Sequence, residues 1–192
     1  MGRSFTEREK ETIRQSLQDA CKQNWTRYGY KKTSIEELCR QVGISKGAFY
    51  LFFESKEALF CEVLCQVQKQ ICDGAARIIA KYQDKRGVAE ALKYIYREYD
   101  KYNFLYNADS MDHTILLHKL SEDQTQRLKE SERMSQQIFY DAPWLKFRIE
   151  KDKAMAVIYA LIMNLKNKEI LPYDHTETFD FMVDHLIGSL YE

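Results

Sequence analysis

A short run of residues in the first third of the chain carries side chains suited to hydrogen bonding with nucleic acid. Its hydroxyl, ammonium and phenol groups come from Ser45, Lys46 and Tyr50. A lysine can donate to guanine O6 and N7 or to phosphate, and a phenol can donate to phosphate. Gly47 and Ala48 between them allow close approach to a backbone and to thymine methyl groups. The run therefore predicts a helix that enters the DNA major groove.

Two short helices joined by a tight turn must hold this run in place. A hydroxyl at Thr33 or Ser34 can cap the first helix, and Gly43 suits the left-handed position that ends it. Ser45 can cap a second helix, expected over residues 46–53. The buried face of the first helix follows helical spacing through Ile35, Leu38, Cys39 and Val42. This pattern predicts a helix-turn-helix.

The direction of the second helix decides whether it can read DNA. Phe49 and Phe53 lie four residues apart, so both can face inward and leave the polar residues outside. The alternative is a helical hairpin inside an ordinary bundle, in which Tyr50 and Phe52 only pack. A bundle helix has no reason to be this short, to carry glycine and to be capped, so the DNA-reading interpretation is favoured.

A known family shares this combination of residues. The shared residues are Gly29-Tyr30, Thr33-Ser34-Ile35, Gly43 to Gly47, Tyr50, Phe53 and Ser55 to Leu59. Over residues 13–64 the chain thereby resembles the N-terminal domain of the tetracycline-repressor (TetR) family of transcriptional regulators. Departures are Cys39, where the family usually has alanine, and Phe52, where a histidine or tyrosine would supply a polar phosphate contact.

The resemblance also implies roles for individual side chains in DNA binding. By that resemblance Thr33 and Ser34 touch phosphates, Tyr50 reaches the backbone or a base, and Lys56 holds a phosphate. The residues implied to lie against base edges are Ser45, Lys46, Gly47 and Ala48.

Charge is divided unevenly along a chain of 192 residues whose formal net charge is zero. Residues 1–56 contain 11 basic and 7 acidic side chains, and residues 57–192 contain 18 and 22. A mildly basic N-terminal part followed by a mildly acidic remainder is typical of a protein that binds DNA through its N-terminal part. We expect a helix-turn-helix DNA-binding domain over residues 1–56 and a helical effector-binding and dimerisation domain over residues 57–192.

The whole chain is expected to be all-α. Two prolines and seven glycines interrupt it, and no stretch alternates apolar with polar residues for long enough to form a strand. Helices are expected over residues 6–28, 56–81, 88–102, 121–140, 150–166 and 176–191. The helix over 56–81 joins the two domains without a flexible linker.

Cysteine usage and hydropathy indicate a soluble cytoplasmic protein. The five cysteines are odd in number, which implies no disulfide framework: Cys21, Cys39, Cys61, Cys65 and Cys72. Three of them share one side of a helix, which leaves a metal or redox sensor as an alternative to small buried apolar side chains. The longest apolar run, residues 154–163, is too short to cross a bilayer, and no signal-peptide core is present.

A tyrosine-rich region suggests where an effector binds. Aromatic side chains with polar ends suit a pocket for a small hydrophobic molecule, and the candidate lining residues are Tyr96, Tyr99, Met111 and His113. The alternative is that these tyrosines have no role in effector binding and belong to the core and surface of a helical bundle. Asp109, Asp112 and His113 also have a spacing that could share a metal, but nothing else has ligand spacing. No metal and no cofactor is expected.

Two apolar helices near the C-terminus are expected to pair with a second copy. Their candidate dimerisation residues are Val157, Leu161, Phe179, Met182, Val183, Leu186 and Ile187. No catalytic motif occurs, so an enzyme is not expected. The sequence predicts a ligand-responsive repressor that binds a palindromic DNA operator as a homodimer and is released by a small hydrophobic effector. The alternative is a helical interaction or sensor protein for a metal, a redox signal or a protein partner.

Overall fold

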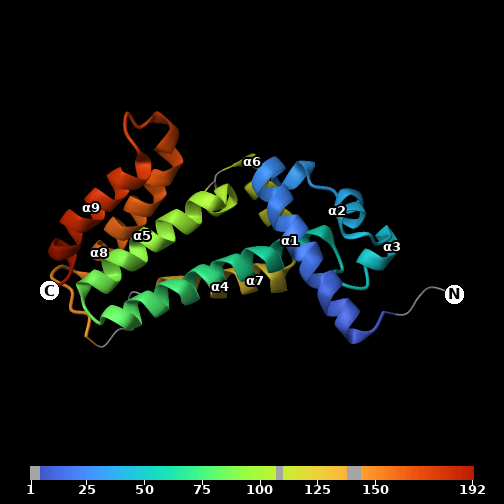
Figure 1. The fold of residues 1–192 in the computed structure, drawn as a ribbon, viewed down its shortest axis with the longest axis horizontal. Helices are drawn as coiled ribbons and strands as arrows, with labels where there is room; N and C mark the ends of the chain where they lie inside the picture. Colours follow the sequence, from blue (N-terminus) through green and yellow to red (C-terminus); the bar gives the residue numbers. More distant parts are fainter. Residues whose placement is uncertain (1–4, 107–109, 138–143) are drawn as a thin grey trace. The chain divides into compact units, whose positions relative to one another are not determined.

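α-Helices make up most of the described residues (Figure 1). A computed structural model describes residues 5–106, 110–137 and 144–192. The helices are α1 (Glu7–Lys32), α2 (Ile35–Val42), α3 (Lys46–Phe49), α4 (Lys56–Tyr82), α5 (Lys85–Lys101), α6 (Met111–Lys119), α7 (Glu122–Gln137), α8 (Lys151–Met163) and α9 (His175–Leu190), with 3-10 segments η1 (Asn103–Leu105) and η2 (Asn164–Ile170). The expected all-α fold, with an N-terminal helix-turn-helix, is confirmed.

Two compact units divide the chain, and each gathers segments that are separate in sequence. The first unit comprises Met1–Val67 and Ala108–Lys129, and the second comprises Gln68–Asn107 and Glu130–Glu192. Helices α4 and α7 supply residues to both units, whereas α6 belongs to the first. The functional division expected after residue 56 stays a prediction, since packing alone does not assign roles to the two parts.

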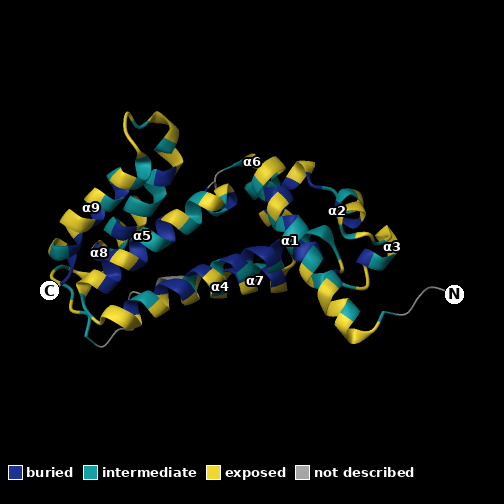
Figure 2. Cartoon of the chain, viewed as in Figure 1, coloured by how far each residue is buried: buried dark blue, intermediate teal, exposed yellow. Residues whose placement is uncertain are grey.

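The core of the first unit is aromatic. Trp25 of α1 lies 4.7 Å from the ring of Phe60 of α4, and Tyr30 meets the same ring edge-on at 5.0 Å between centroids. Such tilted and edge-on pairs add to the free energy gained by burying the rings. Phe49 and Phe53 are both buried, as the four-residue spacing predicted. Figure 2 shows buried and exposed segments alternating along the helices. Their burial fixes which side of α3 faces outward.

Capping residues set the ends of the two short helices. The Ser34 hydroxyl accepts from the Glu37 amide, and the Ser45 hydroxyl accepts from the Ala48 amide. Between them Gly43 is left-handed, at φ 76° and ψ 32°, and its amide donates to the Cys39 carbonyl. All three positions behave as the sequence predicted, because each depends on contacts only three or four residues away.

Helix lengths differ from the sequence-based ranges at several ends. The range of α1 extends past residue 28 to Lys32 because a short helical stretch follows a kink at Gly29, whose φ of 82° and ψ of 172° are not helical. Helix α3 ends at Phe49 rather than at residue 53, because the next amides bond three residues back: Leu51 to Ala48 and Phe52 to Phe49. Helix α8 ends at Met163, and η2 follows it.

The second unit packs α9 along α5 (Figure 1). The ring of Tyr96 stacks on Phe179 with 3.7 Å between centroids and 11° between planes. Val183 and Ile187 follow Phe179 on the buried stripe of α9, while Leu92 and Ile95 lie on the buried face of α5. This stripe is internal to the unit and forms its core.

Within the described residues no helix has the length and apolar character that crossing a bilayer requires. Nor do these residues contain three or more His, Cys, Asp or Glu side chains grouped for a metal ion. Asp109, one member of the metal alternative, lies outside the described residues. All five cysteines are free thiols; Cys21, Cys39 and Cys61 are buried, and Cys65 and Cys72 are half-buried.

Candidate DNA-binding surface

The outward face of α3 presents the residues expected to read DNA. Ser45, Lys46, Gly47 and Tyr50 are exposed, with half of the Tyr50 side chain accessible, and Ala48 is half-buried. Among the described residues, a Cβ atom built on Gly47 would meet only Ser45 Oγ within 4 Å, at 3.9 Å. The surface can therefore approach a flat partner closely.

The Lys46 ammonium is held by an acidic side chain of the preceding helix. Its Nζ atom lies 2.5 Å from Oε1 of Glu36 in the first turn of α2, and both side chains are more than half exposed. The hydrogen bond and the charge of Glu36 raise the pKa of Lys46, and Lys46 lowers the pKa of Glu36. Lys46 stays charged at neutral pH and must share its donors between Glu36 and any DNA acceptor.

Two hydroxyls expected to touch phosphates are engaged within the chain. Thr33 is 1% exposed, and its Oγ1 donates to the Gly29 carbonyl at 2.8 Å. A phosphate contact by Thr33 would therefore have to use the backbone rather than the side chain. Ser34 is half-buried, and its hydroxyl accepts from the Glu37 amide while keeping its own donor available.

Lys56 lies at the first position of α4 and is half-buried. Its Nζ atom donates to the Tyr30 carbonyl at 2.5 Å and lies 4.0 Å from the centre of the Tyr30 ring. Desolvation is the largest influence and lowers the pKa of Lys56, although Glu57 opposes it. An ammonium has three donors, so a phosphate contact remains compatible with the bond to Tyr30.

Arg14 of α1 joins three parts of the first unit, a role that no pattern in the sequence predicted. Its Nε donates to Glu62 of α4 at 3.0 Å, and a terminal nitrogen donates to the other carboxylate oxygen. The second terminal nitrogen donates to the Phe52 carbonyl at 2.7 Å, and the guanidinium lies 4.4 Å from the centre of the Phe53 ring. Arg14 therefore fixes the segment that follows α3 against α1 and α4.

Helix α6 contacts the end of α1 within the first unit. An oxygen of Asp112 accepts from the Lys31 amide at 3.3 Å, two residues after the kink. The φ of 82° favours glycine at position 29, and a Cβ atom there would lie 2.3 Å from the same carboxylate oxygen, so a side chain would displace the Asp112 carboxylate. Lys119 at the other end of α6 lies 4.0 Å from Glu57.

The four residues expected to bind an effector divide between the two units. Tyr96 is buried, and its hydroxyl lies 3.2 Å from Nδ1 of His175. Tyr99 is also in the second unit, where burial raises its pKa to about 12. Met111 and His113 lie on α6 in the first unit, and Met111 is largely exposed. Their joint role in effector binding stays a prediction.

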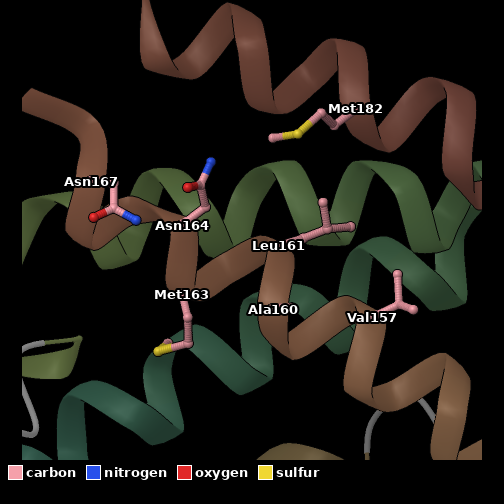
Figure 3. A pocket seen from close by; sticks show the side chains of 7 residues that line it. All are labelled: Val157, Ala160, Leu161, Met163, Asn164, Asn167 and Met182. Carbon is pink, nitrogen blue, oxygen red and sulfur yellow. The ribbon is translucent and has the colours of Figure 1, made fainter. Parts of the chain in front are cut away.

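The residues expected at a dimer contact separate into a buried and an accessible set. Phe179, Val183 and Ile187 lie in the core of the second unit. Val157, Leu161 and Met182 are half-buried, and Leu186 is exposed. Three of the accessible residues line an open groove of about 500 Å³ (Figure 3), whose lining is Val157, Ala160, Leu161, Met163, Asn164, Asn167 and Met182. Exposed Tyr159 and Phe181 belong to the same two helices.

Comparison with known proteins finds a family match in the N-terminal part of the chain. Residues 19–63, which span most of α1, all of α2 and α3 and the start of α4, match the bacterial regulatory proteins of the tetR family. These residues therefore form the N-terminal DNA-binding part of a TetR-family transcriptional regulator. It is 53% identical over 36 residues to the uncharacterized HTH-type transcriptional regulator YuxN of Bacillus subtilis, and 32% identical over 53 residues to YhgD of the same organism. These matches cover 19% and 28% of this chain, and 12% and 28% of the two relatives.

Solved structures share the fold over nearly the whole chain. The regulator FadR from Bacillus subtilis, determined in complex with stearoyl-CoA, has a TM-score of 0.70 at 15% identity and covers 91% of this chain and 98% of its own. A TetR/AcrR-family regulator from Thermobifida fusca has a TM-score of 0.69 at 17% identity, with 92% and 97% covered. At these identities the likeness establishes the fold. The family consists of regulators rather than enzymes, in agreement with the sequence-based expectation.

Proposed function

We propose that this TetR-family chain binds double-stranded DNA through α3 and controls transcription in response to a small molecule. The observation that carries the proposal is the outward face of α3, where Ser45, Lys46, Gly47 and Tyr50 are exposed while Phe49 is buried. Hydroxyl, ammonium and phenol groups on a surface without steric obstruction suit base edges and phosphates. Lys56 adds a phosphate contact at the start of α4.

The active form we propose is a homodimer. The partly exposed residues of α8 and α9 give an apolar surface that a second copy could cover: Val157, Leu161, Met182 and Leu186, with Tyr159 on α8. An isologous contact between two such surfaces would relate the two copies of α3 by a dyad. The operator is then a palindrome, with half-site centres about 34 Å apart or somewhat more.

The effector we propose is small and hydrophobic, and its binding releases DNA. Support comes from the aromatic side chains of Tyr96 and Tyr99 and from the structural neighbour FadR, which was determined with stearoyl-CoA. Thermodynamic linkage makes this effect reciprocal. If the effector weakens operator binding by some factor, the operator weakens effector binding by the same factor.

Selection of bound duplexes from a random pool, followed by gel shift, tests the DNA-binding proposal. Lys46→Ala should weaken binding to the selected site by roughly 1–3 kcal/mol, because it removes a contact to a base or to the backbone beside it. Lys56→Ala should weaken all duplexes alike and reduce the dependence of affinity on salt. Lys69→Ala, which removes an exposed lysine of α4 in the second unit, is the matched control and should leave binding unchanged.

A chain that selects no sequence and shifts no duplex at low salt would exclude the proposal. It would then favour the alternative, a helical interaction or sensor protein that uses the same fold for a metal, a redox signal or a protein partner.

A further inference from the structure

The ion pair between Glu36 and Lys46 lies on the surface proposed to meet DNA. Glu36 is in the first turn of α2, Lys46 is the first residue of α3, and their side chains are 62% and 54% exposed. The pair therefore bridges the two helices of the helix-turn-helix across its outer face. A carboxylate in this position is unexpected on a surface that must approach a polyanion.

The neighbouring acidic residue has a different environment. Glu37 bonds to Arg40 at 2.7 Å and to Gln41 at 2.9 Å, both on α2 itself. Its charge is thus paired within one helix, where the partners move together. Only Glu36, of these two glutamates in the first turn, takes its partner from α3.

When DNA binds, its acceptors compete with the Glu36 carboxylate for the Lys46 ammonium. When phosphate alone attracts Lys46, the ammonium must leave or share Glu36, and the carboxylate is then brought near a negatively charged backbone. An exposed pair contributes little to stability, so base-edge acceptors in a fixed position can replace it. A contact with a mobile phosphate offsets the loss of the Glu36–Lys46 ion pair less well, because a phosphate does not offer Lys46 two acceptors in fixed directions.

We propose that Glu36 is a specificity-determining residue, whose carboxylate holds Lys46 and lowers affinity for DNA that lacks the correct base edges. The proposal rests on the proposed DNA-binding function of α3. It assigns Glu36 a restraining role: the residue weakens binding to non-operator DNA more than binding to the operator. Glu36 positions and competes for Lys46, and needs no base contact of its own.

Charge-removing variants of the two glutamates test this role. Glu36→Gln keeps the size of the side chain and removes its charge, and Glu37→Gln makes the same change one residue away. Affinities for the selected operator and for a random-sequence duplex of equal length are measured by fluorescence anisotropy at low and high salt. Glu36→Gln should tighten random-duplex binding by roughly 3- to 5-fold, the range that an exposed pair allows, and operator binding by less than about 2-fold.

The control and a double variant separate the pair from a general charge effect. Glu37→Gln should change both affinities by the same small factor. In a Lys46→Gln background, Glu36→Gln should lose most of its effect on the ratio of the two affinities, because no ammonium remains to be held. Raising the salt concentration should reduce the effect of Glu36→Gln, since the charges are exposed.

Three results would overturn the proposal. Equal tightening of both duplexes by Glu36→Gln would mean that Glu36 sets affinity alone. An equal change of the ratio by Glu37→Gln would reduce the effect to net charge. An undiminished effect in the Lys46→Gln background would remove the ion pair from the explanation. Failure of the wild-type chain to bind any duplex is a separate result, which would reject the proposed function itself.

Discussion

Replacement of Arg14 by alanine should loosen the DNA-binding unit from a position outside the surface that touches DNA. The guanidinium bonds to both oxygens of Glu62 and to the carbonyl of Phe52, and it lies over the Phe53 ring. Without the guanidinium, Glu62 keeps the hydrogen bond that it accepts from the Gln18 amide. The Phe52 carbonyl loses the hydrogen bond that Arg14 donates to it at 2.7 Å. The loss at Phe52 affects the segment between α3 and α4, and the loss at Glu62 affects the contact between α1 and α4.

The size of the effect follows from the number of bonds and their exposure. A hydrogen bond to a charged group contributes about 1.5–3 kcal/mol, and Arg14 makes such bonds to two separate acceptor groups. The Arg14 and Glu62 side chains are 35% and 23% exposed, so solvent screens part of this energy. We expect Arg14→Ala to lower the free energy of unfolding by roughly 2–3 kcal/mol, which for a chain of this size lowers the Tm by roughly 4–12 °C.

Thermal unfolding by circular dichroism, with hydrogen exchange of residues 46–56, measures both the size and the place of the change. Arg14→Lys keeps the charge but cannot form the two-pronged bond to Glu62, so its Tm should fall between those of the wild type and Arg14→Ala. Arg8→Ala, an exposed arginine on the same helix, should change the free energy of unfolding by no more than about 0.5 kcal/mol. Wild-type stability and exchange in Arg14→Ala would refute this account of how α3 is held.

Three further predictions concern assembly, effector response and thiol chemistry. Leu186→Asp should give monomers in sedimentation that bind DNA poorly, whereas Leu117→Asp, a similarly exposed leucine of α6, should leave the mass unchanged; a monomeric wild type would contradict the dimer. Tyr99→Phe and His113→Gln should reduce the response to an effector found by thermal-shift screening while ligand-free operator affinity stays nearly intact; a normal response would move the pocket elsewhere. A hydrogen bond from Cys61, aided by the charge of Arg127, lowers the pKa of Cys65 to about 7, so alkylation of Cys65 by iodoacetamide should rise with pH and level off above about pH 8. Burial raises the pKa of Cys21, which should stay unreactive in the folded chain. Mass spectrometry of the peptides distinguishes the two cysteines, and an unreactive Cys65 would contradict the prediction.

Features that depend on a few neighbouring residues could be read from the sequence. Thr6 and Glu9 form the capping box expected at the start of α1, and Gly43 takes the left-handed conformation expected after α2. The inward direction of Phe49 followed from its four-residue spacing to Phe53. In each case the physical cause lies within one helical turn, so no knowledge of the tertiary fold was needed.

Features that depend on distant partners could not be read in this way. The bonds of Arg14 to Glu62 and of Lys56 to Tyr30 join residues 48 and 26 positions apart, and periodicity indicates which face is buried but not what packs against it. The apolar stripe of α9 shows the same limit. Its spacing predicted burial correctly, yet Phe179, Val183 and Ile187 are covered by the same unit, which leaves Met182 and Leu186 as accessible residues.

The contact of α6 with α1 gives the first unit a route by which events away from α3 can affect it. Asp112 bonds to the Lys31 amide, and its carboxylate leaves no room for a side chain at Gly29. Only two residues separate this bond from Ser34, the N-cap of α2. Because Gly29 lies at φ 82° and the Thr33 hydroxyl bonds to its carbonyl, a shift of Asp112 must be taken up at the kink or passed on to α2. Helix α6 therefore contacts the backbone at the end of α1 close to the N-cap of α2, at a place separate from the outward face of α3.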